Sequence, residues 1–187
     1  MRALGRLLPR DPGGENAMAV RLFRRVEAAR DLLQAGPLQR RWQRRGDLPH
    51  WPPVAGEYRV GDVTARVAVC TLSSRDLIEP VSALPGVAIA GRLFTVNLGI
   101  ERMVTNLISN PGIRALVLCG KDSPVFHTAQ AIRAFVENGV TTERRIIGAQ
   151  GHWPVLGNLS PTQIARFRDQ ITLVEAIGTS ELPAIAG

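Results

Sequence analysis

The stretch from Leu84 to Val140 decides the fold. It reads LPGVAIAGRLFTVNLGIERMVTNLISNPGIRALVLCGKDSPVFHTAQAIRAFVENGV. Residues 87–90 and 113–119 are short apolar runs, which are typical of buried strands. Between them, residues 98–108 carry apolar side chains at the i, i+3, i+4, i+7 spacing of a helix. A buried strand, a helix and a second buried strand therefore follow one another.

The same alternation continues on both sides of this stretch. Upstream, residues 67–72 form another apolar run and predict a buried strand. Downstream, a helical stripe at 131–136 is closed by Gly139, a residue typical of helix C-termini. Residues 145–148 are predicted to form a short strand.

The last helix is marked by its start signals. Ser160 is an N-cap candidate, Pro161 follows at the first helical position, and Gln163 completes a capping-box pattern. The buried stripe of this helix is predicted to comprise Ile164, Phe167, Ile171 and Val174. In contrast, residues 48–61 are rich in proline and aromatic residues, and we expect no regular structure there.

Strands that alternate with helices at short spacing predict an α/β fold. We expect a Rossmann-like three-layer sandwich, with a mainly parallel sheet between helices, over residues 48–187. Ligands of such sheets bind beyond the carboxyl ends of the strands. The segments expected there are 71–75, 90–97, 120–130 and 148–155.

Residues 1–47 form a separate basic extension with a predicted helix at 17–34. Residues 1–48 hold 11 arginines against five acidic residues, so they carry most of the net charge of +7. Docking on its own domain or on a partner protein is the first interpretation of this helix. Weak binding to an anionic membrane surface is the second, and nucleic-acid binding is the least favoured.

Bulk features favour a protein of the cytoplasm. No apolar run approaches the roughly 18 residues that span a bilayer, and the first residues lack the apolar core of a signal peptide. Cys70 and Cys119 lie in apolar strand-like runs. They are predicted to be buried free thiols, as expected in a reducing compartment.

Several phrases of the chain occur in the same order in one known family. They are Trp51-Pro52, Gly56-Glu57-Tyr58, Asn97-Leu98-Gly99-Ile100-Glu101, Ile108-Ser109-Asn110-Pro111, Leu118-Cys119-Gly120 and Glu137-Asn138-Gly139-Val140. From about residue 51 to residue 177 the chain resembles the A-subunit family of tetrahydromethanopterin S-methyltransferase. The resemblance implies a bound corrinoid (a cobamide such as cobalamin) whose cobalt carries a methyl group. That group would pass from a methyl-pterin to a thiol such as coenzyme M.

One position at the centre of this chemistry departs from the family. The family carries Gly-His-(Ile/Val)-Thr-Gly-Gln after Cys-Gly, and its histidine approaches the cobalt. When Thr128 and Gln130 are aligned with that phrase, Phe126 occupies the ligand position and Ala129 replaces a glycine. Phenylalanine cannot donate to a metal, whereas a neutral imidazole can. His127, one residue later, is the candidate axial ligand, and a capping or solvent-facing role is its alternative.

The resemblance also nominates residues that could line a corrinoid pocket. For each of them a turn or cap is the alternative role, with Asn97 as an N-cap and Glu101 in the first helical turn. His152 is a reserve axial donor, and its alternative is a structural histidine packed with Trp153. The remaining nominated residues are Thr71, Ser73, Gly91, Gly99, Gly120, Phe126, Thr128, Ala129, Gln130, Gly148 and Gly151.

Two functions remain open. The first is a corrinoid-dependent methyl carrier that works with a methyl-pterin or methyl-folate donor system and a partner methyltransferase subunit. Because the chain ends without a membrane helix, we expect it not to belong to a sodium-pumping membrane complex. The second is a non-catalytic relative that binds a pterin, a corrinoid or a partner protein as an accessory domain.

Overall fold

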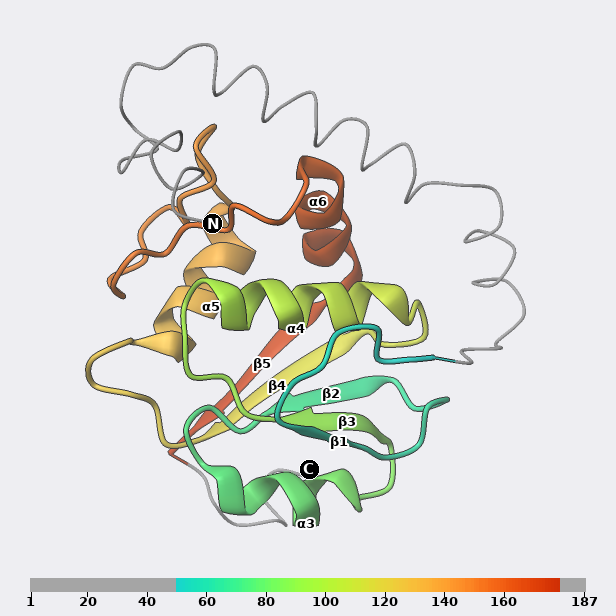
Figure 1. Ribbon diagram of the computed structural model, residues 1–187. Coiled ribbons are helices and arrows are strands. Elements are labelled where there is room, and N and C mark those ends of the chain that lie inside the picture. Colours follow the sequence, from blue (N-terminus) through green and yellow to red (C-terminus); the bar gives the residue numbers. More distant parts are fainter. Residues whose placement is uncertain (1–49, 179–187) are drawn as a thin grey trace, which may run out of the picture.

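The computed structural model describes residues 50–178, and its centre is a five-stranded sheet. The strand order is β1-β3-β2-β4-β5 (Figure 1). Strands β2, β3, β4 and β5 run parallel, and β1 pairs antiparallel with β3. The predicted basic extension, residues 1–47, lies outside the described residues. The strands are β1 (Tyr58–Val60), β2 (Val67–Cys70), β3 (Val87–Gly91), β4 (Ala115–Gly120) and β5 (Thr172–Ile177).

The central strands are the apolar runs that the sequence predicts. Val69 of β2 pairs with Ala90 of β3 on one side and with Val117 of β4 on the other. Val69 and Ala90 are buried, because helices cover both faces of this part of the sheet. The prediction of an α/β fold with a mainly parallel sheet is confirmed at this level.

Helices lie on both faces of the sheet (Figure 1). α4 (Leu98–Ser109), α5 (Thr128–Asn138) and α6 (Pro161–Gln170) share one face and enclose the larger core. A short 3-10 helix, η2 (Arg75–Leu77), and α3 (Ile78–Ser82) cover a smaller core on the other face. The sequence analysis missed α3, whose five residues are too few to show a helical period.

Local signals set the helix ends as predicted. Ser160 Oγ accepts from Gln163 N–H at 3.1 Å, and Gln163 Oε1 accepts from Ser160 N–H at 2.9 Å, which completes the capping box. Gly139 ends α5 with a φ of +74°, and its N–H donates to the Phe135 carbonyl. These caps satisfy backbone groups that a helix leaves unpaired at its ends.

Three predicted elements are wrong. The last helix ends at Gln170, and Val174 lies in β5 instead of on a helical stripe. Residues 145–148 form no strand, since only Arg145 and Ile146 make isolated bridges. Residues 58–60, expected to be irregular, form β1. In each case long-range pairing decided the conformation, and pairing partners cannot be read from a local pattern.

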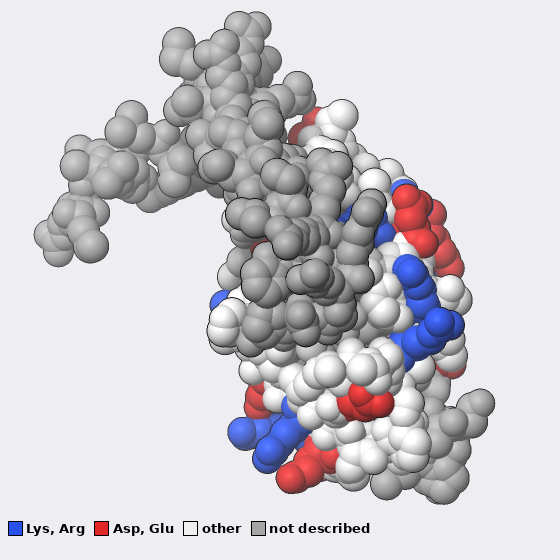
Figure 2. All heavy atoms as spheres, turned by 90° about the vertical axis from the view of Figure 1, so that its right-hand side faces the viewer, with Lys and Arg blue, Asp and Glu red and all other residues white. Residues whose placement is uncertain are grey.

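The chain changes direction across the sheet at β2. β3 lies on one side of β2 and β4 on the other, so the loops after β2 and β4 leave the same edge at a topological switch point. Figure 2 looks at the right-hand side of Figure 1, away from those loops. There, the described residues show basic and acidic side chains interspersed rather than a surface of one sign.

Candidate functional site

The loops after β2 and β4 touch each other directly at the switch point. Ser73 Oγ donates to the Lys121 carbonyl at 2.6 Å, and Lys121 N–H donates to Ser74 Oγ at 3.0 Å. Gly120 has a φ of +75°, and a Cβ there would lie 2.7 Å from the Thr71 carbonyl oxygen. Because Gly120 has no side chain, the loop after β2 can pack directly against it.

Thr71 follows β2 at the same edge. It is fully buried. Among the described residues, its Oγ1 is the one buried side-chain oxygen or nitrogen that has no hydrogen-bond partner. A buried hydroxyl without a partner costs free energy. Thr71 is thus a polar group that the protein around it leaves unsatisfied.

Two phenylalanines join the loop after β3 to the loop after β4. The rings of Phe94 and Phe126 lie 5.0 Å apart between centroids at an interplanar angle of 59°. Thr128 Oγ1 donates to the Phe94 carbonyl at 3.4 Å, and Gly151 packs so closely that a Cβ would lie 2.3 Å from the Phe126 carbonyl oxygen. Residues of three predicted site segments, 90–97, 120–130 and 148–155, are therefore brought together.

His127 sits at the start of α5 in a left-handed conformation, with a φ of +46°. Its side chain is half-buried and makes no capping hydrogen bond. The helix start is instead served by Asp122, whose carboxylate accepts from Ala129 N–H at 3.1 Å. His127 therefore occupies the N-cap position of α5, but its side chain does not cap the helix. A non-glycine residue with positive φ is uncommon, and such residues concentrate at functional sites.

The side chain of Gln130 forms two hydrogen bonds with the segment that follows α5. Its Nε2 donates to the Gly148 carbonyl at 2.8 Å, and its Oε1 accepts from Gln150 N–H at 3.0 Å. His152, farther along this segment, is exposed, so it is not the packed structural histidine of the alternative interpretation. The neighbouring Trp153 ring lies under the Arg145 guanidinium, 5.4 Å from the ring centroid to Cζ.

Asn97 and Glu101 both have structural partners. Asn97 Oδ1 accepts from Leu98 N–H at 2.7 Å, so its predicted N-cap role is confirmed. Glu101 is buried, and its two carboxylate oxygens accept from the backbone N–H and the side-chain amide of Asn158, each at 2.7 Å. Glu101 therefore anchors the segment before α6. A ligand-binding role for these residues stays a prediction.

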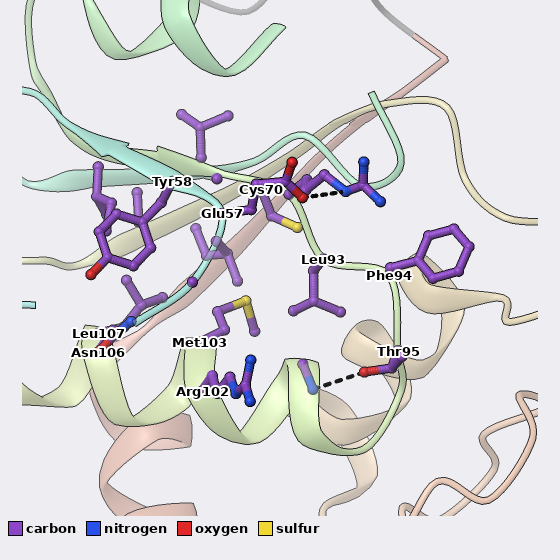
Figure 3. A pocket seen from close by; sticks show the side chains of 18 of the residues that line it. Glu57, Tyr58, Cys70, Leu93, Phe94, Thr95, Arg102, Met103, Asn106 and Leu107 are labelled. Carbon is purple, nitrogen blue, oxygen red and sulfur yellow. Dashed lines mark hydrogen bonds and ion pairs between the residues drawn. The ribbon is translucent and has the colours of Figure 1, made fainter. Parts of the chain in front are cut away.

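A cavity of about 380 Å³ lies between the sheet and α4 (Figure 3). Of the predicted site residues, Gly91 and Gly99 line it, but His127 and Phe126 do not. Figure 3 shows Cys70, Leu93 and Met103 pointing into the same space, with Arg102 on the α4 side. Sequence analysis missed Arg102 and Met103, because a helical stripe does not show which of its residues border a gap in the packing.

Both cysteines are buried free thiols, as predicted. Burial raises the pKa of Cys70 to about 12 and that of Cys119 to about 11. Both thiols are therefore protonated near neutral pH and are poor nucleophiles. Within residues 50–178, no group of three or more His, Cys, Asp or Glu side chains could hold a metal ion. The same residues contain no helix long and apolar enough to cross a membrane.

Comparison with known proteins identifies relatives over most of the chain. A-subunit 1 of the tetrahydromethanopterin S-methyltransferase of Methanothermobacter thermautotrophicus is 44% identical over 144 residues, which cover 76% of this chain and 60% of that protein. A-subunit 2 from the same organism is 45% identical over 137 residues, 73% of this chain and 74% of that protein. The corresponding A-subunit of Methanocaldococcus jannaschii is 45% identical over 131 residues, 70% of this chain and 54% of that protein.

The chain thus spans about 60% of the length of the first of these relatives. The sequence model that describes the A-subunit of tetrahydromethanopterin S-methyltransferase matches residues 44–187. That range contains every described strand and helix and all of the loops at the carboxyl edge of the sheet. The chain therefore belongs to the A-subunit family of tetrahydromethanopterin S-methyltransferase.

Proposed function

We propose that this chain is a corrinoid-binding methyl carrier, with the corrinoid at the carboxyl edge of the sheet. The observation that carries the proposal is the environment of the His127 side chain, in a chain that belongs to this family. Its imidazole is half-buried at the meeting point of three loops, and it makes no capping hydrogen bond. An imidazole nitrogen that is not committed to the protein can donate to a metal.

The side chains around His127 suit a large, flat and partly apolar ligand. Phe94 is 44% exposed and Val125 is 68% exposed, and both lie in loops at this edge. Exposed apolar groups of this kind are often covered by a ligand. Gly120 and Gly151, however, are packed against protein atoms. The ligand would therefore rest on side chains of the rim and not on bare glycine backbone.

Within this proposal each residue has a limited role. His127 would hold the corrinoid from one side, and Phe94 and Val125 would exclude water beside it. The bound corrinoid would supply a cobalt ion that accepts and releases a methyl group. The donor would be a methyl-pterin or methyl-folate, the acceptor would be a thiol such as coenzyme M, and partner subunits would present both.

A second function is favoured by Phe126. This residue occupies the family's ligand position, and its ring packs against Phe94. A side chain committed to packing that also lacks a donor atom suits a non-catalytic relative. Such a protein would bind a pterin, a corrinoid or a partner protein as an accessory domain.

The test is a titration of the full chain with hydroxocobalamin, followed by visible absorption. The carrier proposal expects uptake and a change of the cobalt spectrum that is lost in His127→Ala. His50→Ala is the matched control, because His50 is an exposed histidine that is not among the nominated site residues. Absence of uptake would exclude both corrinoid-binding alternatives. Uptake with an unchanged spectrum in His127→Ala would remove His127 from the proposal.

We also propose that residues 1–47 dock on the domain or on a partner protein. Their predicted helix carries Phe23, Val26 and Leu33 among arginines, which suits a narrow contact surface. A variant that begins at residue 48 should unfold at a lower temperature than the full chain if docking is intramolecular. Equal melting temperatures would exclude docking on the domain itself.

A further inference from the structure

The cavity beside α4 is apolar on its inner side. Ala68, Cys70 and Leu116 of the sheet line it and are almost completely buried. From α4, Leu107 is also buried, and Met103 is partly buried and reaches into the space (Figure 3). Methionine is flexible and adapts to ligands of different outline. These residues can bury an apolar body but offer it few hydrogen bonds.

The outer side of the cavity is positively charged. Arg92 and Glu57 line it and form an ion pair at 3.0 Å. The same Glu57 carboxylate also pairs with Arg75 at 2.8 Å, so one negative charge serves two arginines. Arg102 also lines the cavity, is exposed, and has no carboxylate within ion-pair distance among the described residues. Two arginines and one carboxylate therefore line the cavity, and the carboxylate is shared with a third arginine, Arg75, that does not line it.

Most other polar groups at the cavity are already used. The Asn106 side chain accepts from Val54 N–H and donates to the Val54 carbonyl. Thr95 Oγ1 accepts from Gly99 N–H, and Leu98 N–H donates to Asn97. The guanidinium of Arg102 is thus the strongest recognition group at the cavity that has no hydrogen-bond or ion-pair partner among residues 50–178. An arginine of this kind binds carboxylate, sulfonate or phosphate oxygens.

We propose that this cavity binds a small amphiphilic anion, with its apolar body against Met103 and Leu116 and its anionic group on Arg102. A volume of about 380 Å³ lies near the lower end of small-molecule pockets, so it suits one ring system or a short alkyl chain. Binding is non-covalent, since burial raises the pKa of the lining Cys70 thiol to about 12. The site is separate from the loop that carries His127.

Two sources can supply this chemistry. One is a free organic acid, and the other is the nucleotide tail of a corrinoid, which joins a flat base to a phosphodiester. Phe94 connects the two regions, because it lines the cavity and also packs against Phe126. Only binding of the corrinoid tail depends on the corrinoid-carrier function proposed above.

The first experiment uses the full chain and the fluorescent anion 8-anilinonaphthalene-1-sulfonate. We expect saturable binding at one site, weakened about 10- to 100-fold in Arg102→Gln, as for loss of one charge-assisted hydrogen bond. Arg114→Gln is the matched control, because Arg114 is an exposed arginine that does not line the cavity. No saturable binding, or equal affinity of Arg102→Gln and the native chain, would overturn the proposal.

Two further measurements locate the probe. Trp51 Nε1 donates to the carbonyl of Asn106, which lines the cavity, so Trp51 should transfer excitation to a bound probe. Trp51→Phe should remove most of that transfer, and an unchanged signal would contradict the location. Met103→Trp should fill the space and abolish binding, with circular dichroism as the check on folding.

Competition identifies the source. Displacement by benzoate or octanoate, with no effect of hydroxocobalamin, assigns the cavity to a free acid. Displacement by hydroxocobalamin but not by cobinamide, which lacks the nucleotide tail, assigns it to the corrinoid tail. If none of these compounds displaces the probe, the proposed ligand class is wrong. Loss of cobalt-spectrum changes in His127→Ala tests the other site independently.

Discussion

The rings of Phe94 and Phe126 pack at 5.0 Å and 59°, and this contact ties the loop after β3 to the loop before α5. The two residues are separated by 32 positions in the sequence and by a helix and a strand in the fold. Their contact places Phe126 against Phe94, which lines the cavity beside α4. The loop that carries Phe126 and the wall of the cavity, which are far apart in the sequence, are therefore in direct contact through these two rings.

This aromatic pair should contribute measurably to stability. We expect a double-mutant cycle of Phe94→Leu and Phe126→Leu to give a coupling energy of about 0.5–1.5 kcal/mol, because tilted rings attract beyond their buried area. Urea unfolding of the four proteins measures it. A coupling energy near zero would mean that the rings touch without a specific interaction.

Gly151 should tolerate no side chain. A Cβ at this position would lie 2.3 Å from the Phe126 carbonyl oxygen and 2.9 Å from Val96 Cγ1. Gly151→Ala should therefore destabilise the protein by about 1–3 kcal/mol. Gly157→Ala is the control, since a Cβ there meets nothing within 4 Å. Equal melting temperatures of the two variants would contradict the packing at Gly151.

Removal of the Glu101 carboxylate should destabilise the segment before α6. Glu101→Ala loses two hydrogen bonds to Asn158 and should cost about 2–4 kcal/mol. Glu137→Ala, a change at an exposed glutamate of α5, should stay within about 0.5 kcal/mol. Chemical denaturation measures both. A small loss for Glu101→Ala together with weakened ligand binding would indicate that Glu101 serves the ligand instead.

Alkaline pH should destabilise the protein through its buried thiols. The pKa of Cys70 is raised from 9.0 to about 12 by burial, so the unfolded chain releases this proton first as the pH rises. Stability is therefore lost above pH 9, by about 2 kcal/mol for this thiol at about pH 10.5. Cys70→Ala should show a shallower fall of unfolding free energy between about pH 8.5 and 10.5. Parallel pH profiles would show that Cys70 is not the cause.

The capping box at Ser160 should account for part of the stability of α6. Ser160→Ala removes the acceptor for Gln163 N–H and should cost about 1 kcal/mol. Thr162→Ala changes an exposed residue of the same turn and serves as the control. Thermal unfolding compares them, and an equal effect of both changes would argue against the cap.

Elements with strong local signals were predicted from the sequence. The apolar runs of β2, β3 and β4, the stripe of α4 and the caps at Ser160 and Gly139 needed no information from distant residues. β5 was misread because its exposed edge carries apolar residues such as Val174 beside polar ones. An edge strand lacks the continuous apolar pattern of a strand buried on both faces.

The candidate site was predicted only in part. The expectation that segments 90–97, 120–130 and 148–155 meet at one edge is met by the contacts of Phe126 with Phe94 and Gly151. The close packing of Gly120 and Gly151 against protein could not be predicted, because a glycine that approaches a ligand and a glycine that admits a loop look alike in sequence. No sequence motif indicated the cavity beside Arg102.

Residue order within short windows was enough to predict the alternation of β2, β3 and β4 with α4 and α5, the helix caps and the family. The packed fold was needed to show that Glu101 is held by Asn158, 57 positions away, and that Arg102, one residue later, borders a cavity. Adjacent residues on a helix point about 100° apart. How the helix lies on the sheet therefore decides which one becomes an anchor and which one faces open space.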